Sequence, residues 1–141
     1  MDFSEHVLIS AGGSVALYSS GAGAPAAAAF FACGVFMDLD HLADYWRETG
    51  LNFRVREFMD YFWMRRPRRL LLFLHSFELG PLLALCFAWK GAPAWAWAAL
   101  AGWAVHLFLD DKVNRLHRWA YFFGFRLWHR FDARIIDTFK N

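Results

Sequence analysis

No Asp, Glu, Lys or Arg lies between His6 and the polar sequence Asp38-Leu39-Asp40-His41. This charge-free stretch is longer than the ~20 apolar residues of a single membrane span. It is divided by residues 19–25, which are rich in Ser and Gly and end in Pro, a composition typical of a turn. We therefore expect two membrane-spanning helices, over residues 4–20 and 24–42. Both are rich in Gly and Ala, which let transmembrane helices approach closely.

Two further apolar runs, residues 70–89 and 94–110, are joined by the tight-turn sequence Lys90-Gly91-Ala92-Pro93. With 58% of its residues hydrophobic, the chain exceeds the roughly 45–50% of soluble domains. These runs predict an all-α fold, a four-helix transmembrane bundle that forms a single domain over residues 1–141. A soluble helical bundle is the weaker alternative, because its helices would need charged outer faces.

Two segments, at about 53–64 and about 113–138, combine large apolar residues at helical spacing with charged residues, and the second is rich in Arg. This pattern predicts amphipathic helices that lie in the membrane interface. For the first segment, an ordinary surface helix fits equally well. In the second, basic residues alternate with large apolar ones instead of forming an open patch, so we expect no nucleic-acid partner. Asp44, His117 and His129 are expected to be solvated or interfacial residues.

All but one of the 15 Lys and Arg residues lie between the second and third predicted spans or after the fourth, and the exception is Lys90. Positively charged loops stay on the cytoplasmic side of a membrane. The distribution predicts a multi-pass protein of the inner (plasma) membrane with its N- and C-termini in the cytoplasm. The expected partners are the lipid bilayer and either other subunits of a membrane complex or further copies of the chain.

Each predicted span carries metal-ligating residue types near its cytoplasmic end. They are His6 in the first span, Asp38, Asp40 and His41 in the second, His75 and Glu78 in the third, and His106 and Asp110 in the fourth. Because an unpaired ionisable residue in a span costs about 2.5–3.5 kcal/mol, these side chains should be paired, metal-bound or facing water. Mixed imidazole and carboxylate ligands favour a divalent metal, zinc first, with manganese or iron as alternatives.

The spacing within the spans supports convergence on one site. The pairs Asp38/His41 and His75/Glu78 are i, i+3, and the pair His106/Asp110 is i, i+4, so each pair shares one helix face. On a regular helix Asp40 lies about 100° from His41. If all three polar residues of the second span bind metal, we expect the helix to unwind there.

Simpler interpretations remain for each group. His6 can be a solvated residue near a terminus, and Asp38 can merely end its helix. Glu78 can pair with an Arg of the middle loop. His106 and Asp110 can form a hydrogen-bonded pair without metal.

The order of these groups resembles that of the YdjM-like, membrane-bound metal-dependent hydrolases. That family shows an early His and then the blocks P-D-I/L-D-H, H-R-G-x-T-H-S and G-x-x-x-H-x-x-x-D. The matching residues here, which span 6–110, are His6, Met37-Asp38-Leu39-Asp40-His41, Leu74-His75-Ser76 and Gly102 to Asp110. The chain departs from the family pattern at Met37 (for Pro), Leu70 (for the leading His of the third block) and Leu74 (for Thr). The blocks are also distantly similar to those of zinc-dependent phospholipases C.

The resemblance implies a metal-dependent hydrolase, with a phosphoester or lipid-like substrate at the cytoplasmic membrane face. A bound metal would lower the pKa of water toward about 7 and polarise the scissile group. Asp38 or Glu78 could act as a general base, and Arg68 and Arg69 could bind a phosphate head group. The alternative is a non-catalytic membrane subunit that keeps a structural metal or a polar network, which Leu70 at a ligand position favours.

Overall fold

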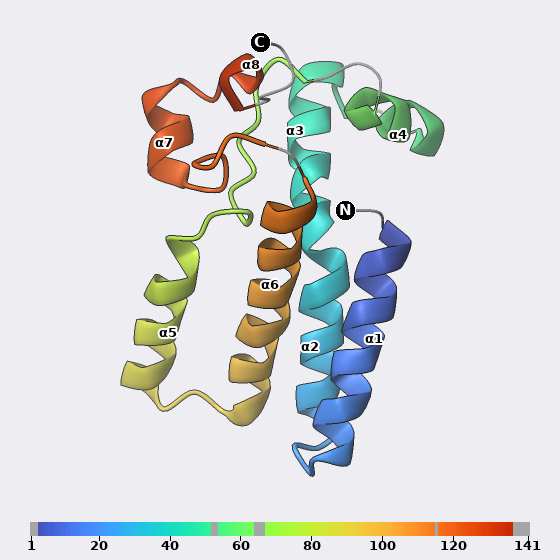
Figure 1. The fold of residues 1–141 in the computed structure, drawn as a ribbon, viewed down its shortest axis with the longest axis vertical. Coiled ribbons are helices and arrows are strands. Elements are labelled where there is room, and N and C mark those ends of the chain that lie inside the picture. Colours follow the sequence, from blue (N-terminus) through green and yellow to red (C-terminus); the bar gives the residue numbers. More distant parts are fainter. Residues whose placement is uncertain (1–2, 52–53, 64–66, 115, 137–141) are drawn as a thin grey trace. The chain divides into compact units, whose positions relative to one another are not determined.

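A computed structural model describes residues 3–51, 54–63, 67–114 and 116–136, and in these residues the fold is all-helical, as predicted. The chain divides into two compact units (Figure 1). Unit 1 contains residues up to Met37 and residues 77–114, and unit 2 contains residues 38–76 and the chain from 115 onward. Each unit is therefore formed by two separate parts of the sequence.

Unit 1 consists of four helices. They are α1 (Phe3–Ser19), α2 (Ala24–Phe36), α5 (Leu79–Lys90) and α6 (Ala94–Val113). Both expected turns are present: glycines at positive φ, Gly21 and Gly23, precede α2, and a left-handed Gly91 ends α5. Helix α2 packs against both α1 and α6, and α5 packs against α6. The predictions for residues 4–20 and 94–110 are thus confirmed as helices to within a few residues.

Helices α2 and α6 cross closely because Gly102 has no side chain. A Cβ at this position would overlap the backbone carbonyl of Phe30. The Phe30 ring is buried with Ala26 and Ala98 in the core of unit 1. One turn further along, the Gly34 carbonyl accepts a hydrogen bond from His106 Nδ1 at 2.8 Å. The close crossing at Gly102 therefore sets the distance at which His106 can reach the α2 backbone.

Gly102→Ala is expected to destabilise unit 1 by about 1–3 kcal/mol, because α2 and α6 must separate to admit a methyl group. The matched control is Gly12→Ala in α1, where an added Cβ meets nothing within 4 Å. That change should be neutral or stabilising by up to about 1 kcal/mol, since Ala favours helix over Gly. Thermal unfolding of the two variants in detergent measures the difference, and equal melting temperatures would contradict the close crossing.

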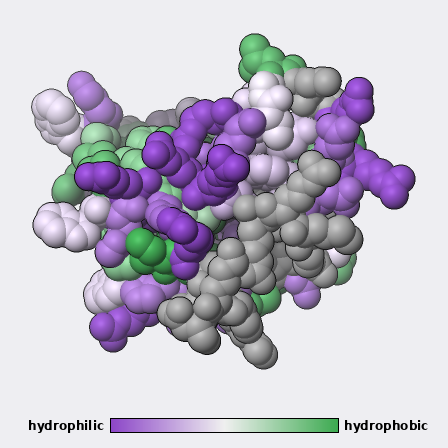
Figure 2. All heavy atoms as spheres, turned by 90° about the horizontal axis from the view of Figure 1, so that it is seen from above, coloured by the Kyte–Doolittle hydropathy of each residue, from purple (hydrophilic) through white to green (hydrophobic). Residues whose placement is uncertain are grey.

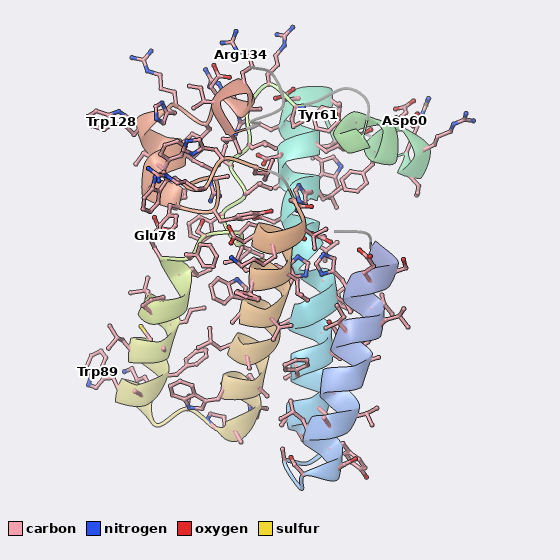
Figure 3. The ribbon with its side chains drawn as sticks, in the orientation of Figure 1. Asp60, Tyr61, Glu78, Trp89, Trp128 and Arg134 are labelled. Atoms are coloured by element: carbon pink, nitrogen blue, oxygen red, sulfur yellow. The ribbon has the colours of Figure 1, made fainter. Side chains whose placement is uncertain are left out.

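Unit 1 exposes many large apolar side chains on its helices. Leu8, Val15, Leu85 and Trp89 are 72%, 65%, 70% and 82% exposed, and Figure 3 shows Trp89 on α5. Within the described residues, one helical stretch, Ala24–Thr49, is long and apolar enough to cross a membrane by length and composition. This is weak support for a membrane location, and the four-span arrangement stays a prediction.

Unit 2 has shorter helices. They are α3 (Asp40–Thr49), α4 (Val55–Trp63), α7 (Phe123–Trp128) and α8 (Ala133–Ile136), and a 3-10 turn, η1 (Met37–Leu39), precedes α3. The prediction of a helix at 53–64 is confirmed over the range of α4. The prediction of one continuous helix at 113–138 is wrong, because α7 and α8 are separated by a turn in which Arg130 and Phe131 have positive φ.

The predicted third span is also wrong over residues 70–78, because α5 begins only at Leu79. The preceding segment is irregular and crosses one face of α3. Three α3 carboxylates at a spacing of four accept its backbone N–H groups: Glu48 from Arg68 and Arg69, Asp44 from Leu71 and Leu72, and Asp40 from Leu74 and His75. Beyond the isolated bridge of Arg69 with Asp132 the segment belongs to no sheet, so most of its backbone N–H groups need other acceptors. Asp44, expected to be solvated, is instead buried for this purpose.

Arg126 holds the same segment from the other side. Its side chain is completely buried. The guanidinium donates to the carbonyls of His75, Ala120 and Leu72, each at 2.8 Å, and to the Ser76 hydroxyl. The expectation that this residue lies in an interfacial face is wrong. Arg126 and the α3 carboxylates together fix the loop that carries His75.

Candidate functional site

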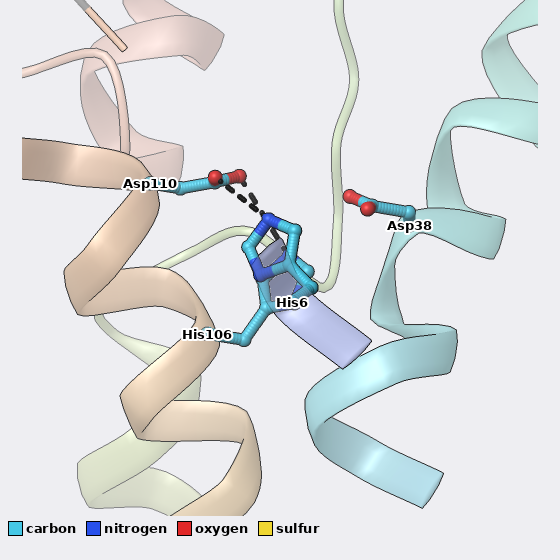
Figure 4. A group of neighbouring side chains, drawn as sticks. All are labelled: His6, Asp38, His106 and Asp110. Carbon is cyan, nitrogen blue, oxygen red and sulfur yellow. Dashed lines mark hydrogen bonds and ion pairs between the residues drawn. The ribbon is translucent and has the colours of Figure 1, made fainter. Parts of the chain in front are cut away.

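The first candidate site is a histidine and aspartate group in unit 1. His6 on α1 and His106 on α6 have stacked rings with centroids 3.8 Å apart. His6 Nε2 lies 3.1 Å from Asp110 Oδ1, and His106 Nε2 lies 3.7 Å from Asp110 Oδ2 (Figure 4). All three residues are buried, at 1%, 1% and 4% exposed. Asp38, which Figure 4 also draws, belongs to unit 2 and is described with it.

The hydrogen bond to Gly34 determines which nitrogen of His106 carries a proton. A backbone carbonyl only accepts, so His106 Nδ1 must donate to it. In a neutral imidazole, Nε2 then presents a lone pair, and that lone pair lies beside the Asp110 carboxylate. Two electron-rich groups in this arrangement need a cation or a proton between them. His6 Nδ1 is also buried, with no hydrogen-bond partner in the described part of the chain.

The unit 1 group fits a metal by its chemistry and its spacing. One ligand atom each of His6, His106 and Asp110 can be chosen so that all lie within 4.8 Å of one another. Zinc ligands at about 2.0–2.1 Å in a tetrahedron lie about 3.3 Å apart, close to the 3.1 and 3.7 Å separations here. A second-shell carbonyl on a ligating histidine is a usual feature of zinc sites. This His/Asp group could therefore hold a metal ion.

The second candidate group lies in unit 2 and contains Asp38, His41 and His75. Asp38 Oδ1 lies 3.4 Å from His75 Nε2 and 3.7 Å from His41 Nε2. The shared face predicted for Asp38 and His41 is thus observed. The chain leaves α-helical geometry at Met37–Leu39, by a tighter 3-10 turn rather than by unwinding.

Asp40 occupies a different position from the other members of its sequence block. Its Oδ2 lies 3.4 Å from His75 Nδ1, on the opposite side of the ring from Asp38. A carboxylate at this position orients the imidazole and leaves its Nε2 for a metal. The same oxygen accepts the Leu74 N–H at 2.7 Å. Asp40, predicted as a ligand, is placed to position His75.

Glu78 belongs to neither group. It is exposed and lies immediately before α5, as Figure 3 shows. His75 and Glu78 were expected to share a helix face, which is wrong because neither lies within a helix. Arg68 and Arg69 are exposed and line a cleft of unit 2, so their predicted role as head-group ligands stays a prediction.

Four residues that shape these groups were not identified from the sequence. They are Gly34, Asp44, Glu48 and Arg126, which act through backbone hydrogen bonds. The i, i+4, i+8 spacing of Asp40, Asp44 and Glu48 was a usable signal, because it places three carboxylates on one helix face. Arg126 resembles its neighbouring arginines in sequence, and nothing local distinguishes it.

Comparisons with known proteins identify no relative of this chain. No family model, no curated protein and no solved structure matches it.

Proposed function

We propose that this chain is a membrane-bound, metal-dependent hydrolase that acts on a phosphoester or lipid-like substrate at the cytoplasmic membrane face. The observation that carries the proposal is the unit 1 group, in which the Gly34 carbonyl leaves His106 Nε2 facing the Asp110 carboxylate. Buried histidine and carboxylate side chains directed at one another are typical of metal ligands. The unit 2 group of Asp38, His41 and His75 supports a second ion.

Four membrane-spanning segments with cytoplasmic termini are part of the proposal. The support is the set of apolar side chains that unit 1 exposes on its helices, including Leu85 and Trp89. Outward-facing apolar surface of this kind is stable in contact with lipid tails or another apolar partner. The positions of Lys and Arg then favour the cytoplasmic side for residues 43–69 and for the chain after Asp111.

The residues of the two groups have distinct roles in this proposal. His6, His106 and Asp110 would hold one ion, and Asp38, His41 and His75 a second, with zinc favoured over manganese and iron. The ion would supply a water of lowered pKa, near about 7, and polarise the scissile phosphoryl or acyl group. Asp40 and the Gly34 carbonyl fix the tautomers of His75 and His106. Asp38 is better placed than Glu78 as a general base, a role that it would take instead of that of a ligand, because it lies within a group.

Hydrolysis assays on the purified chain in detergent test this proposal. The zinc- or manganese-loaded protein should cleave bis(p-nitrophenyl) phosphate or short-chain phospholipids. His106→Ala should lower the rate more than about a hundredfold, because losing a ligand costs at least as much as losing an outer-shell partner. The matched control is His117→Ala, a histidine of unit 2 outside both groups. Activity that survives both metal chelation and His106→Ala would contradict the proposal.

The second candidate function is a non-catalytic membrane subunit with a structural metal. Leu70 favours it, because this position carries histidine in the family that the chain resembles. Stable co-purification with other membrane proteins, together with bound metal but no hydrolysis, would support this alternative.

A further inference from the structure

A cleft of about 590 Å³ in unit 2 is lined by basic residues from two distant parts of the sequence. Its lining residues are Pro67, Arg68, Arg69, His129, Arg130, Asp132 and Arg134. The two parts are joined by an antiparallel bridge between Arg69 and Asp132 and by the Ala133 N–H bond to the Arg68 carbonyl, at 3.1 Å. The cleft therefore depends on the folded unit and not on one run of basic sequence.

The arginines of the cleft are only partly neutralised by the protein. Asp132 is the one carboxylate in the lining, and it bonds Arg134 through Nε at 3.1 Å and Nη2 at 2.7 Å. The side chains of Arg68, Arg69 and Arg130 form no ion pair with the rest of the described chain. The guanidiniums of Arg68 and Arg130 are thus available to an external anion, whereas the charge of Arg69 also acts on Asp132.

The turn that carries Arg130 has an unusual backbone conformation. Arg130 and Phe131 adopt left-handed conformations, at φ 55° and 61°, which are uncommon for residues other than glycine. The Phe131 N–H bond to the Arg126 carbonyl at 2.7 Å and the Asp132 N–H bond to the His129 carbonyl at 3.1 Å hold this turn. Unusual backbone geometry maintained by surrounding bonds is frequent at binding sites. Figure 2 shows hydrophilic residues gathered on the face that it views.

We propose that this cleft binds the phosphate group of a phosphomonoester, carried either by a lipid head group or by a free metabolite. Several guanidiniums in one cleft favour a phosphomonoester over a phosphodiester, because a monoester carries up to two negative charges and three terminal oxygens, whereas a diester carries one charge and two such oxygens. The residues 129–134 that complete the cleft lie outside the part of the chain that resembles known hydrolases. The inference does not require the metal groups, so metal-free protein can test it.

Binding is measured on the full chain in detergent with EDTA present. The probes are glycerol 3-phosphate and dihexanoyl phosphatidic acid, with dihexanoyl phosphatidylcholine as the phosphodiester control. Saturable binding of either phosphomonoester, with none of the control lipid, is the expected result. Equal affinity for glycerol 3-phosphate and dihexanoyl phosphatidic acid would identify the phosphate group alone as the ligand. Tighter binding of the phosphatidic acid would identify a lipid head group.

Two variants should move the affinity in opposite directions. The double variant Arg68→Gln, Arg130→Gln should weaken binding about tenfold for each guanidinium removed, since each loses a charge-assisted hydrogen bond. Asp132→Asn should strengthen it, because Arg134 is released from its carboxylate partner. Arg118→Gln, an exposed arginine outside the cleft, is the matched control and should leave binding unchanged.

Arg68, Arg118 and Arg130 are solvent-exposed, so the variants at these positions should keep the melting temperature of the original chain. Absence of saturable phosphomonoester binding by the original chain would overturn the proposal. An equal loss of affinity in Arg118→Gln would also overturn it, because it would indicate attraction by the overall positive charge.

Discussion

Arg126→Ala is expected to destabilise unit 2 strongly. The change removes hydrogen bonds to three buried backbone carbonyls, those of His75, Ala120 and Leu72. The Leu72 carbonyl keeps the His75 N–H as a donor, but the His75 and Ala120 carbonyls lose the guanidinium. Each buried acceptor left without a donor costs about 1–3 kcal/mol, and the lost side-chain volume adds to this. A total above about 4 kcal/mol is a large fraction of the 5–15 kcal/mol that stabilises a typical domain.

Limited proteolysis measures this effect, because residues 67–76 should become cleavable in the variant. Arg126→Lys keeps the charge and some hydrogen-bond donors but lacks the planar guanidinium group. Its protease resistance should therefore lie between that of the original chain and that of Arg126→Ala. Arg118→Ala is the control, since that arginine is exposed and lies over the Trp119 ring. Equal protease resistance of Arg126→Ala and Arg118→Ala would show that the buried guanidinium does not hold the segment.

The helices of unit 1 were predictable because their signals are local. Charge-free runs separated by Gly- and Pro-containing turns gave the bounds of α1 and α6 to within a few residues. The pair His106 and Asp110 was likewise recognisable from an i, i+4 spacing, and both lie in α6 as expected. Their contact with His6 could be expected only from the assumption of a common membrane depth.

The segment 70–78 was mispredicted because its apolar sequence resembles a span. Nothing local in it prevents a helix. Its actual conformation depends on the N–H acceptors Asp44 and Asp40, which lie 27 to 35 residues before the residues that they bond. The interaction is therefore between distant residues, and hydrophobic periodicity does not report it. The same limit explains why Arg126 was expected to lie in an amphipathic interfacial helix.

The cleft of unit 2 was predictable in part. Arg68 and Arg69 were predicted to bind a phosphate head group because of their charge and their position just before the third predicted span. The structure adds Arg130, brought beside them by the bridge between Arg69 and Asp132. It also shows that the Arg134 hydrogen bond lowers the pKa of Asp132 to about 2, so this carboxylate stays ionised at neutral pH and remains bonded to Arg134.

His106→Ala is expected to remove one equivalent of bound divalent metal, and His41→Ala a second. The reason is that the two groups, one in each unit, contain separate ligands. The original chain at neutral pH should therefore hold two equivalents of zinc or manganese after dialysis, and a His75→Ala, His106→Ala double variant should hold none. Metal analysis by mass spectrometry, on protein purified in detergent, gives the count.

A control variant and a change of pH distinguish loss of a metal ligand from unfolding and from weak binding of metal at the surface. His117→Ala should retain both equivalents, because that residue belongs to neither group. Acidification should release the metal from the original chain, since imidazole ligands must be deprotonated and protons compete for them. If His106→Ala keeps both equivalents, the unit 1 group is a hydrogen-bonded pair of His6 and Asp110 beside His106, and the lone pair of His106 Nε2 must then be neutralised by a proton.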